Sequence, residues 1–278
     1  MDVSQLLKSA TEQLLNLTES PRLDAEVLLA HSLQKNRTWL VTWPDKALID
    51  TDINQFNELL QRRISGEPIA HITGTREFWS LPLAVTTDTL IPRPDTELII
   101  EKILEIYSVS SDISLADLGT GSGAIALALA SERPHWKITA TDQSTSALQI
   151  AKQNAHNLNL DNITFKLGDW FEPLEDDSFD VVVSNPPYIP MADPHLTQGD
   201  ARFDPVSALA SGDDGLDDIR LITAQAGRHL KTRGKLFIEH GYDQKSKVLD
   251  IFTKNGFIEI QQAHDIANNP RLTFAINP

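Results

Sequence analysis

From Ile113 to the C-terminus, apolar segments of strand length alternate with segments of helical periodicity. This alternation constrains the fold more than any other feature, because strands connected through helices pair side by side in the same direction. It predicts an α/β fold with a doubly wound, mostly parallel, Rossmann-like sheet. Strands are expected over 113–117, 138–141, 163–166, 181–183, 236–239 and 258–260, and helices over 124–130, 146–155, 216–230 and 248–252. A last strand over 271–276 is expected to form an antiparallel edge.

The N-terminal part has a different pattern. Apolar residues recur at helical spacing over 3–15, 25–33 and 53–64, which predicts a small helical bundle and a first domain over 1–67. Between 68 and 93 the period changes to two, which predicts a β-hairpin linker. A helix opening at Pro94-Asp95-Thr96-Glu97 then begins a second domain, expected over 94–278.

Composition excludes several classes of protein. The chain has no cysteine and eight scattered histidines, so neither a thiolate site nor a histidine-built metal site is expected. The net charge is −15, of which −12 comes from Pro94 onward, and no basic stripe suited to nucleic acid is present. No apolar run reaches the roughly 18–20 residues that span a bilayer, and no leader follows Met1. We therefore expect a cytoplasmic protein without a membrane or nucleic-acid partner.

A glycine-rich loop follows the first strand of the second domain. It reads Asp117-Leu118-Gly119-Thr120-Gly121-Ser122-Gly123 and leads directly into a helix. Glycines let a ligand approach the backbone, and the helix N-terminus offers free N–H groups to an anionic group. The loop alone fits either a nicotinamide dinucleotide or S-adenosylmethionine.

Two acidic positions and a tryptophan follow the next two strands. Asp142 lies 23 residues beyond the first glycine, where a carboxylate can accept hydrogen bonds from ribose hydroxyls, or can cap the helix that begins near Ser144. Asp169 and Trp170 close the third strand, where the ring can cover an adenine and the acid can accept from its amine. A buried tryptophan beside a capping acid is the alternative.

The turn after the fourth strand points to the reaction. It reads Asn185-Pro186-Pro187-Tyr188. Two prolines remove two N–H donors and stiffen the turn, so its carbonyl groups stay free and fixed in direction. The Asn185 side-chain oxygen and the Pro186 carbonyl can accept both hydrogens of a planar NH₂ group, and Tyr188 can stack on it. The nitrogen lone pair is then aimed at an electrophilic methyl group, so alignment is the main catalytic contribution.

These features together resemble the S-adenosylmethionine-dependent amino methyltransferases, and most closely the release-factor glutamine methyltransferases of the PrmC/HemK type. The resemblance covers nearly the whole chain and includes blocks at 66–74, 76–79, 90–97, 117–123, 185–188 and 214–216. Departures from the family pattern occur at Asp204-Pro205, at 210–212 and at Glu239-His240-Gly241. The long 189–215 segment is expected to contact the substrate.

The resemblance implies a reaction and a set of site residues. It implies methylation of the side-chain amide nitrogen (N5) of the glutamine in the Gly-Gly-Gln motif of class-1 peptide-chain release factors, with S-adenosylhomocysteine as the second product and no metal. We also expect the nearly neutral helical domain to dock the substrate, and the protein to be a monomer. The implied catalytic residues are Asn185 and Pro186, the substrate contacts are Asn185, Pro186, Pro187 and Tyr188, and the cofactor contacts are Gly119, Thr120, Gly121, Ser122, Gly123, Asp142, Trp170 and Asn185.

Three other functions remain open at this point. A nucleic-acid amino methyltransferase, of the adenine N6 type, acts on a similar flat NH₂ group but generally needs a basic surface. A nicotinamide-dependent dehydrogenase accounts for the glycine loop and Asp142 but leaves the turn at 185–188 without a purpose. A binding module without catalysis would bind S-adenosylmethionine without turnover.

Overall fold

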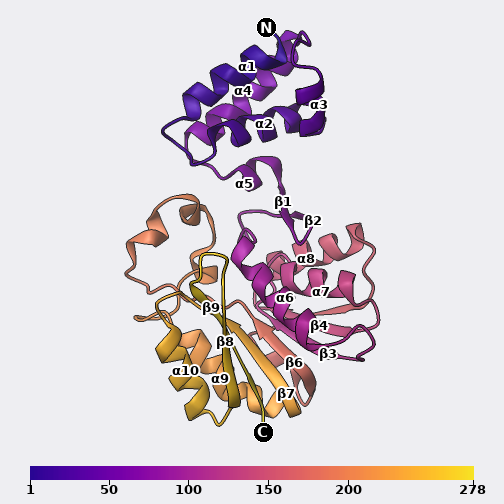
Figure 1. Cartoon of the computed structure of the whole chain (residues 1–278), viewed down its shortest axis with the longest axis vertical. Coiled ribbons are helices and arrows are strands. Elements are labelled where there is room, and N and C mark those ends of the chain that lie inside the picture. Colours follow the sequence, from indigo (N-terminus) through magenta and orange to yellow (C-terminus); the bar gives the residue numbers. More distant parts are fainter. The chain divides into compact units, whose positions relative to one another are not determined.

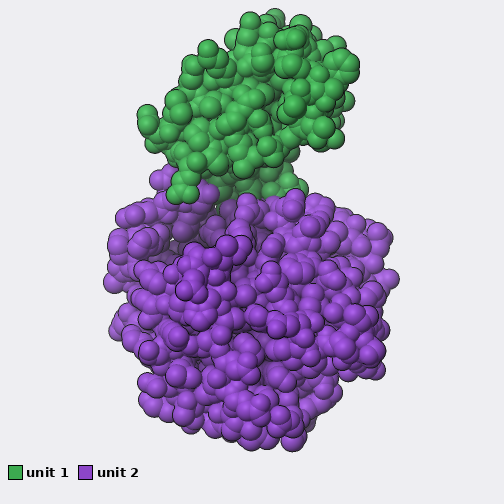
Figure 2. Space-filling view, in the orientation of Figure 1, with its two compact units in different colours: residues 1–75 green, residues 76–278 purple.

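The structure is a computed structural model that describes all residues from 1 to 278 (Figure 1). The chain divides into two compact units, Met1–Thr75 and Arg76–Pro278, which are coloured separately in Figure 2. The first unit has one hydrophobic core and the second has two, one on each face of a sheet. None of the helices is long and apolar enough to cross a lipid bilayer.

The first unit is a bundle of helices, as its periodicity predicts. The capping box at Asp2 and Gln5 fixes the start of the first helix. Its apolar stripes meet in a core that includes Leu7, Leu28 and Phe56. The helices are α1 (Val3–Leu14), α2 (Pro21–Ser32), α3 (Arg37–Thr42), α4 (Asp50–Ile64) and α5 (Ile69–Thr73).

A buried ion pair connects two helices of this bundle. Arg63 of α4 donates to the Asp24 carboxylate of α2 at 2.8 Å, and both side chains are about nine-tenths buried. Ser20 occupies the N-cap position of α2 without a capping bond and donates instead to Asp24 at 2.8 Å. The Asp24 carboxylate therefore accepts from Arg63 on α4 and from Ser20 at the start of its own helix. These two contacts fix the packing of α2 against α4.

The segment expected to form a β-hairpin begins with a helix. Pro68 precedes the short helix α5, which ends at Gly74 with a φ of +71°. The hairpin itself is shorter than the period-two pattern suggests and consists of β1 (Thr75–Phe78) and β2 (Leu81–Ala84). Five residues are too few for a periodic signal, so the pattern alone does not reveal α5.

The second unit contains a seven-stranded sheet, which confirms the predicted fold class. The strands lie in the order β5-β4-β3-β6-β7-β9-β8, and the five from β5 to β7 are parallel. The strands are β3 (Ser114–Leu118), β4 (Lys137–Asp142), β5 (Ile163–Leu167), β6 (Phe179–Ser184), β7 (Leu230–Glu239), β8 (Ile258–His264) and β9 (Pro270–Ile276). The helices are η1 (Pro94–Thr96), α6 (Glu97–Ile106), α7 (Ala124–Glu132), α8 (Thr145–Asn157), α9 (Asp217–His229) and α10 (Lys245–Lys254), with a short η2 (Glu172–Leu174).

Helices cover both faces of this sheet (Figure 1). Leu115, Val183 and Phe237 face a core shared with α6 and α7, whereas their neighbours Ala116 and Val182 face a core shared with α9 and α10. Successive residues of a strand point to opposite faces, so each central strand contributes to both cores. This accounts for the continuous apolar runs that mark these strands in the sequence.

The position of the last strand differs from the prediction. β9 is antiparallel, as expected, but it lies between β7 and β8 and is not an edge. Phe274 of β9 stacks on Phe237 of β7 with ring centroids 5.1 Å apart. The apolar character of β9 is explained by this interior position, and the more polar β8 forms the edge.

The 189–215 segment joins β6 to α9 without a long helix or strand. It contains three short turns of 3₁₀-helix, η3 (Pro194–Thr197), η4 (Asp200–Phe203) and η5 (Val206–Ala208). Its two ends pair where Ile189 bridges Ala210. The segment is therefore a closed loop that returns to the sheet edge near its starting point.

The interior position of β9 predicts a large stability effect at Phe274. Phe274→Ala should lower the free energy of unfolding by about 3–5 kcal/mol, because it leaves a cavity beside Phe237. Ile266→Ala in the connection between β8 and β9 is the control, since this side chain is fully exposed and should change stability by less than about 0.5 kcal/mol. Denaturant unfolding measures both, and equal small effects would contradict the interior placement.

Candidate active site

Three parallel strands end at one edge of the sheet and carry the predicted site residues there. Leu118 of β3 pairs with Thr141 of β4 and with Ser184 of β6. The next residue along each strand is Gly119, Asp142 or Asn185. The register of the sheet therefore brings together three residues that are up to 66 positions apart in the chain.

The glycine loop contributes two residues to a cavity at this edge. Gly119 and Gly121 line the cavity, whereas Thr120, Ser122 and Gly123 do not. A Cβ built on Gly121 meets nothing within 4 Å, so the backbone there is open to a ligand. The Thr120 hydroxyl donates to Asp117 at 2.6 Å, and burial raises the pKa of Asp117 to about 7.

Asp142 has both structural partners and a place at the cavity. Its carboxylate accepts from the Gly121 N–H and from the Ser144 N–H, each at 2.8 Å. Burial raises its pKa, although these two backbone bonds act in the opposite direction. Ser144 is the N-cap residue of α8, so Asp142 supports both the glycine loop and the start of that helix.

Trp170 forms another wall of the cavity. A Cβ on Gly119 would lie 2.9 Å from its ring, so only glycine allows this close packing. Asp169 precedes it, and Asp218 at the start of α9 lines the same cavity. Burial, together with Asp218, raises the pKa of Asp169.

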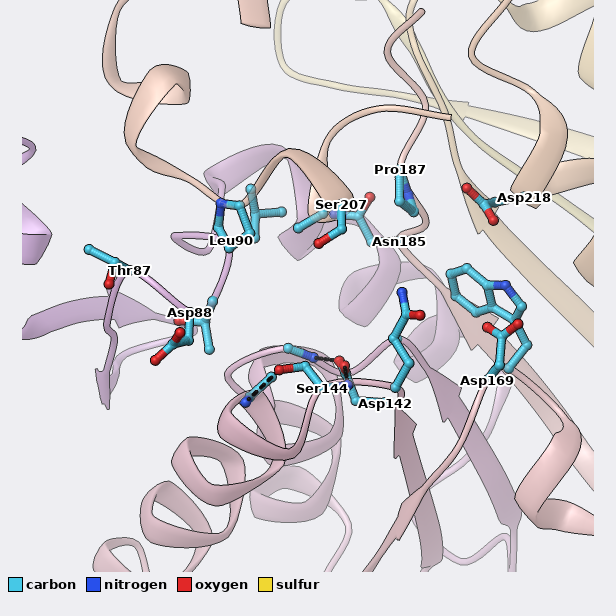
Figure 3. Close-up of a pocket in the computed structure, with 18 residues that line it drawn as sticks. Thr87, Asp88, Leu90, Asp142, Ser144, Asp169, Asn185, Pro187, Ser207 and Asp218 are labelled. Atoms are coloured by element: carbon cyan, nitrogen blue, oxygen red, sulfur yellow. Dashed lines mark hydrogen bonds between the residues drawn. The ribbon is translucent and has the colours of Figure 1, made fainter. Parts of the chain in front are cut away.

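The cavity has a volume of about 420 Å³ and is strongly acidic. Figure 3 shows the side chains around it, with Asp142 and Ser144 on one side and Asn185, Pro187 and Ser207 across the opening. Four aspartates and no lysine, arginine or histidine line it: Asp88, Asp142, Asp169 and Asp218. A cationic ligand suits these walls, whereas the two negative charges of a pyrophosphate do not.

The Asn-Pro-Pro-Tyr turn is held in place by its neighbours. The Tyr188 N–H donates to the Leu209 carbonyl at 3.2 Å, and the Gln244 side chain donates to the Tyr188 carbonyl at 2.8 Å. Gly215, with a φ of +74°, packs so close that a Cβ would lie 2.2 Å from the Tyr188 carbonyl oxygen. By contrast, the Pro186 carbonyl and the Asn185 side-chain oxygen accept no hydrogen bond within the protein. Both remain available to a donor.

A second cavity of about 200 Å³ lies on the other side of this turn. Pro186, Tyr188 and Arg93 line it. Leu90, Asn185 and Ala208 line both cavities. Asn185 therefore lies where the two cavities meet, which is the position that a group aligning one reactant with another would need.

A buried acid, Glu239, lies behind the turn. The Tyr188 hydroxyl approaches Glu239 of β7 at 3.4 Å, and the Asn185 Nδ2 donates to the Thr96 hydroxyl at 3.1 Å. Burial raises the pKa of the Glu239 carboxyl to about 7, although the Thr96 hydroxyl and Arg271 act in the opposite direction. Burial also raises the pKa of the Tyr188 hydroxyl above its usual value.

Comparison with known proteins gives the family. Residues 5–74 match the model of the PrmC N-terminal domain, and residues 109–269 match a methyltransferase domain. The release factor glutamine methyltransferase of Vibrio cholerae is 49% identical over 273 residues, covering 98% of this chain and 95% of that one. The enzyme of the same name from Escherichia coli is 45% identical and covers 98% of both chains.

The chain belongs to the release factor glutamine methyltransferases. The family predicted from the sequence motifs is therefore confirmed, and with it the class of enzyme. The two matched domains fall largely in the two compact units of the structure.

Solved structures support the fold of this family member. A methyltransferase from Pyrococcus furiosus aligns with a TM-score of 0.54 at 16% identity, over 80% of this chain and 98% of that one. A 16S rRNA methyltransferase of T. thermophilus, solved with AdoMet and guanosine, aligns with a TM-score of 0.52 at 16% identity, over 73% of this chain and 50% of that one. These likenesses concern the Rossmann-like sheet alone.

The structure adds site residues that the sequence reading did not single out. The segment 87–89 after the hairpin forms one wall of the larger cavity. Ser207 and Ala208 of η5 form another, within the 189–215 segment that is expected to contact the substrate. Thr96 and Glu239 form the buried layer behind the turn. Only the position of Glu239 at the end of a parallel strand gives a local signal of this role. No group of three or more histidine or acidic side chains is arranged to hold a metal ion.

The close approach of Gly215 to the turn predicts a loss of methyl transfer on a small substitution. Gly215→Ala should reduce turnover at least tenfold, because the added carbon displaces the Tyr188 carbonyl and with it the Asn-Pro-Pro-Tyr turn. Gly256→Ala is the matched control: its φ is +84° and its Cβ meets nothing within 4 Å.

Both variants carry the cost of a left-handed backbone, roughly 1–2 kcal/mol, so thermal melts should show that cost in each. Methyl-transfer assays should separate them, with Gly256→Ala close to the parent enzyme. Full activity of Gly215→Ala would show that the turn tolerates displacement.

Proposed function

We propose that this protein transfers a methyl group from S-adenosylmethionine to the side-chain amide nitrogen (N5) of the glutamine in the Gly-Gly-Gln motif of class-1 peptide-chain release factors. The products are N5-methylglutamine and S-adenosylhomocysteine. One observation carries the proposal: Asn185 lines both cavities with its side-chain oxygen unbonded. The names of relatives that match nearly the whole chain support release factors as the substrate.

The larger cavity fits the cofactor. S-adenosylmethionine supplies an electrophilic methyl group on a positively charged sulfur. Gly119 and Gly121 open the backbone to the ligand, Asp142 can accept from ribose hydroxyls, and Trp170 can cover the adenine. The four aspartates stabilise a net positive ligand. Thr120, Ser122 and Gly123 do not line the cavity; we propose that they act by shaping the loop.

The smaller cavity receives the glutamine side chain. The Asn185 oxygen and the Pro186 carbonyl accept the two amide hydrogens, and Pro187 and Tyr188 complete the binding turn. The amide nitrogen forms a bond to the methyl carbon while the carbon–sulfur bond breaks, and one amide proton is lost to solvent. An amide is a poor nucleophile because its lone pair is delocalised, so fixed acceptors and exclusion of water matter more here than a strong base.

The helical unit has the features of a protein-docking surface. Val41 of α3 is exposed on it, as are Trp43 and Ile49 in the connection between α3 and α4. We propose that the N-terminal domain, predicted over 1–67, contacts the body of the release factor. The linker predicted over 68–93, which contains α5 and the short hairpin of β1 and β2, then leads to the methyltransferase domain over 94–278. The protein acts as a monomer in the cytoplasm, where release factors are found.

The substrate is tested with labelled S-adenosylmethionine and purified release factors. We expect methylation of an intact release factor, much weaker methylation of a short Gly-Gly-Gln peptide, and none after the glutamine is replaced by asparagine, whose shorter side chain does not reach Asn185. Mass mapping locates the methyl group. Label in DNA, or label that persists on a release factor without this glutamine, would support a nucleic-acid or different protein substrate.

The cofactor contact of Asp142 is tested by binding. Asp142→Ala should weaken S-adenosylmethionine binding by about one to two decades, because charge-assisted hydrogen bonds of roughly 1.5–3 kcal/mol are lost. Asp176→Ala is the control, since this exposed acid makes no hydrogen bond and does not line the cavity. Calorimetry measures both, and unchanged affinity in a folded Asp142→Ala variant would remove Asp142 from the site.

A further inference from the structure

The carboxamide of Asn185 has one bonded and one free end. Its Nδ2 donates to the Thr96 hydroxyl at 3.1 Å, and its Oδ1 accepts nothing within the protein. Thr96 is buried, with 4% of its surface exposed, where η1 meets α6. It makes no capping hydrogen bond to α6, so its hydroxyl is not engaged in starting that helix.

The direction of this carboxamide decides what the turn can bind. The two ends of a carboxamide are similar in size but opposite in hydrogen bonding, since the oxygen accepts and the NH₂ donates. An acceptor amide that presents its own hydrogens needs the oxygen. If the Asn185 group turned by half a rotation, two NH₂ groups would face each other and no hydrogen bond would form.

The Thr96 hydroxyl can impose one direction only if its own hydrogen is used elsewhere. A hydroxyl both donates and accepts, so in isolation it would accommodate either end of the carboxamide. Glu239 is the neighbouring acid: its carboxylate is buried, and its Oε2 has no hydrogen-bond partner within the protein, so it is free to accept the Thr96 hydrogen. The Thr96 hydroxyl also acts to lower the pKa of Glu239, against the effect of burial. When the Thr96 hydrogen is directed at this Oε2, the Thr96 oxygen can only accept from Asn185.

We infer that Thr96, oriented by Glu239, is a positioning residue for methyl transfer that keeps the Asn185 oxygen facing the acceptor amide. Thr96 does not line either cavity, so it acts through Asn185 and not by touching the reactants. The inference rests on the proposed function, because it concerns the binding of an NH₂ group at Asn185.

The first test compares three variants in methyl transfer to an intact release factor. Thr96→Val keeps the shape and removes the hydroxyl, and it should lower kcat about tenfold or more while changing cofactor affinity by less than about twofold. Thr96→Ser restores a hydroxyl and should stay within about threefold of the parent kcat. Thr223→Val is the control, since this buried threonine of α9 donates only to the Ile219 carbonyl and should leave kcat unchanged.

The second test asks whether Thr96 acts through Asn185. Asn185→Ala removes the group that Thr96 positions, so adding Thr96→Val to it should cause no further loss. An equal loss from Thr96→Val in both backgrounds would overturn the inference, as would a fully active Thr96→Val or a Thr96→Ser as impaired as Thr96→Val. A parent enzyme that does not methylate the release factor would instead overturn the proposed function.

Discussion

The parallel pairing of β4, β3 and β6 is the constraint on which the site depends. Because these strands run in one direction and in a fixed register, their carboxyl ends coincide at Thr141, Leu118 and Ser184. The register is fixed by packing on two faces, since Leu115 belongs to one core and Ala116 to the other. A slip of one residue would exchange the two faces and move every site residue at once. The hydrophobic packing of the sheet therefore determines the relative positions of the residues at the strand ends.

Much of this arrangement could be predicted because its signals are local. Gly119, Asp142 and Asn185 each follow an apolar strand directly, so sequence pattern and parallel pairing together place them at one edge. The interior position of β9 could not be predicted in the same way. The order of strands in a sheet is decided by long-range pairing, and the apolar character of β9 does not by itself identify the strands that it pairs with. The short helices α3 and α5 were not predicted, because helices of six and five residues, respectively, are too short to show a helical period in the sequence.

The other residues that line the larger cavity belong to irregular segments. Whether such a segment reaches the cavity depends on its contacts with distant parts of the chain. The residues at 87–89 and at 207–208 line the larger cavity without any motif of their own. Asp204 shows how such a segment is held: it accepts from the Ile91 N–H and pairs with Arg93, and its side chain is fully buried. Asp204 is one of the positions that the sequence marked as a departure from the family pattern, and its carboxylate connects the loop to the block at 90–97.

The hydrogen-bonding groups of the turn favour one chemical type of methyl acceptor, but they do not decide whether it belongs to a protein or to a nucleic acid. Two carbonyl acceptors, on Asn185 and Pro186, favour a neutral NH₂ group over a carboxylate, which has no hydrogen to donate, and over an ammonium ion, which has no lone pair. A glutamine amide and an adenine amine both meet this requirement. Discrimination between protein and nucleic acid must therefore come from surfaces outside the turn. A chain of net charge −15, with aspartates around the larger cavity, repels a phosphate backbone and favours a protein loop as the acceptor.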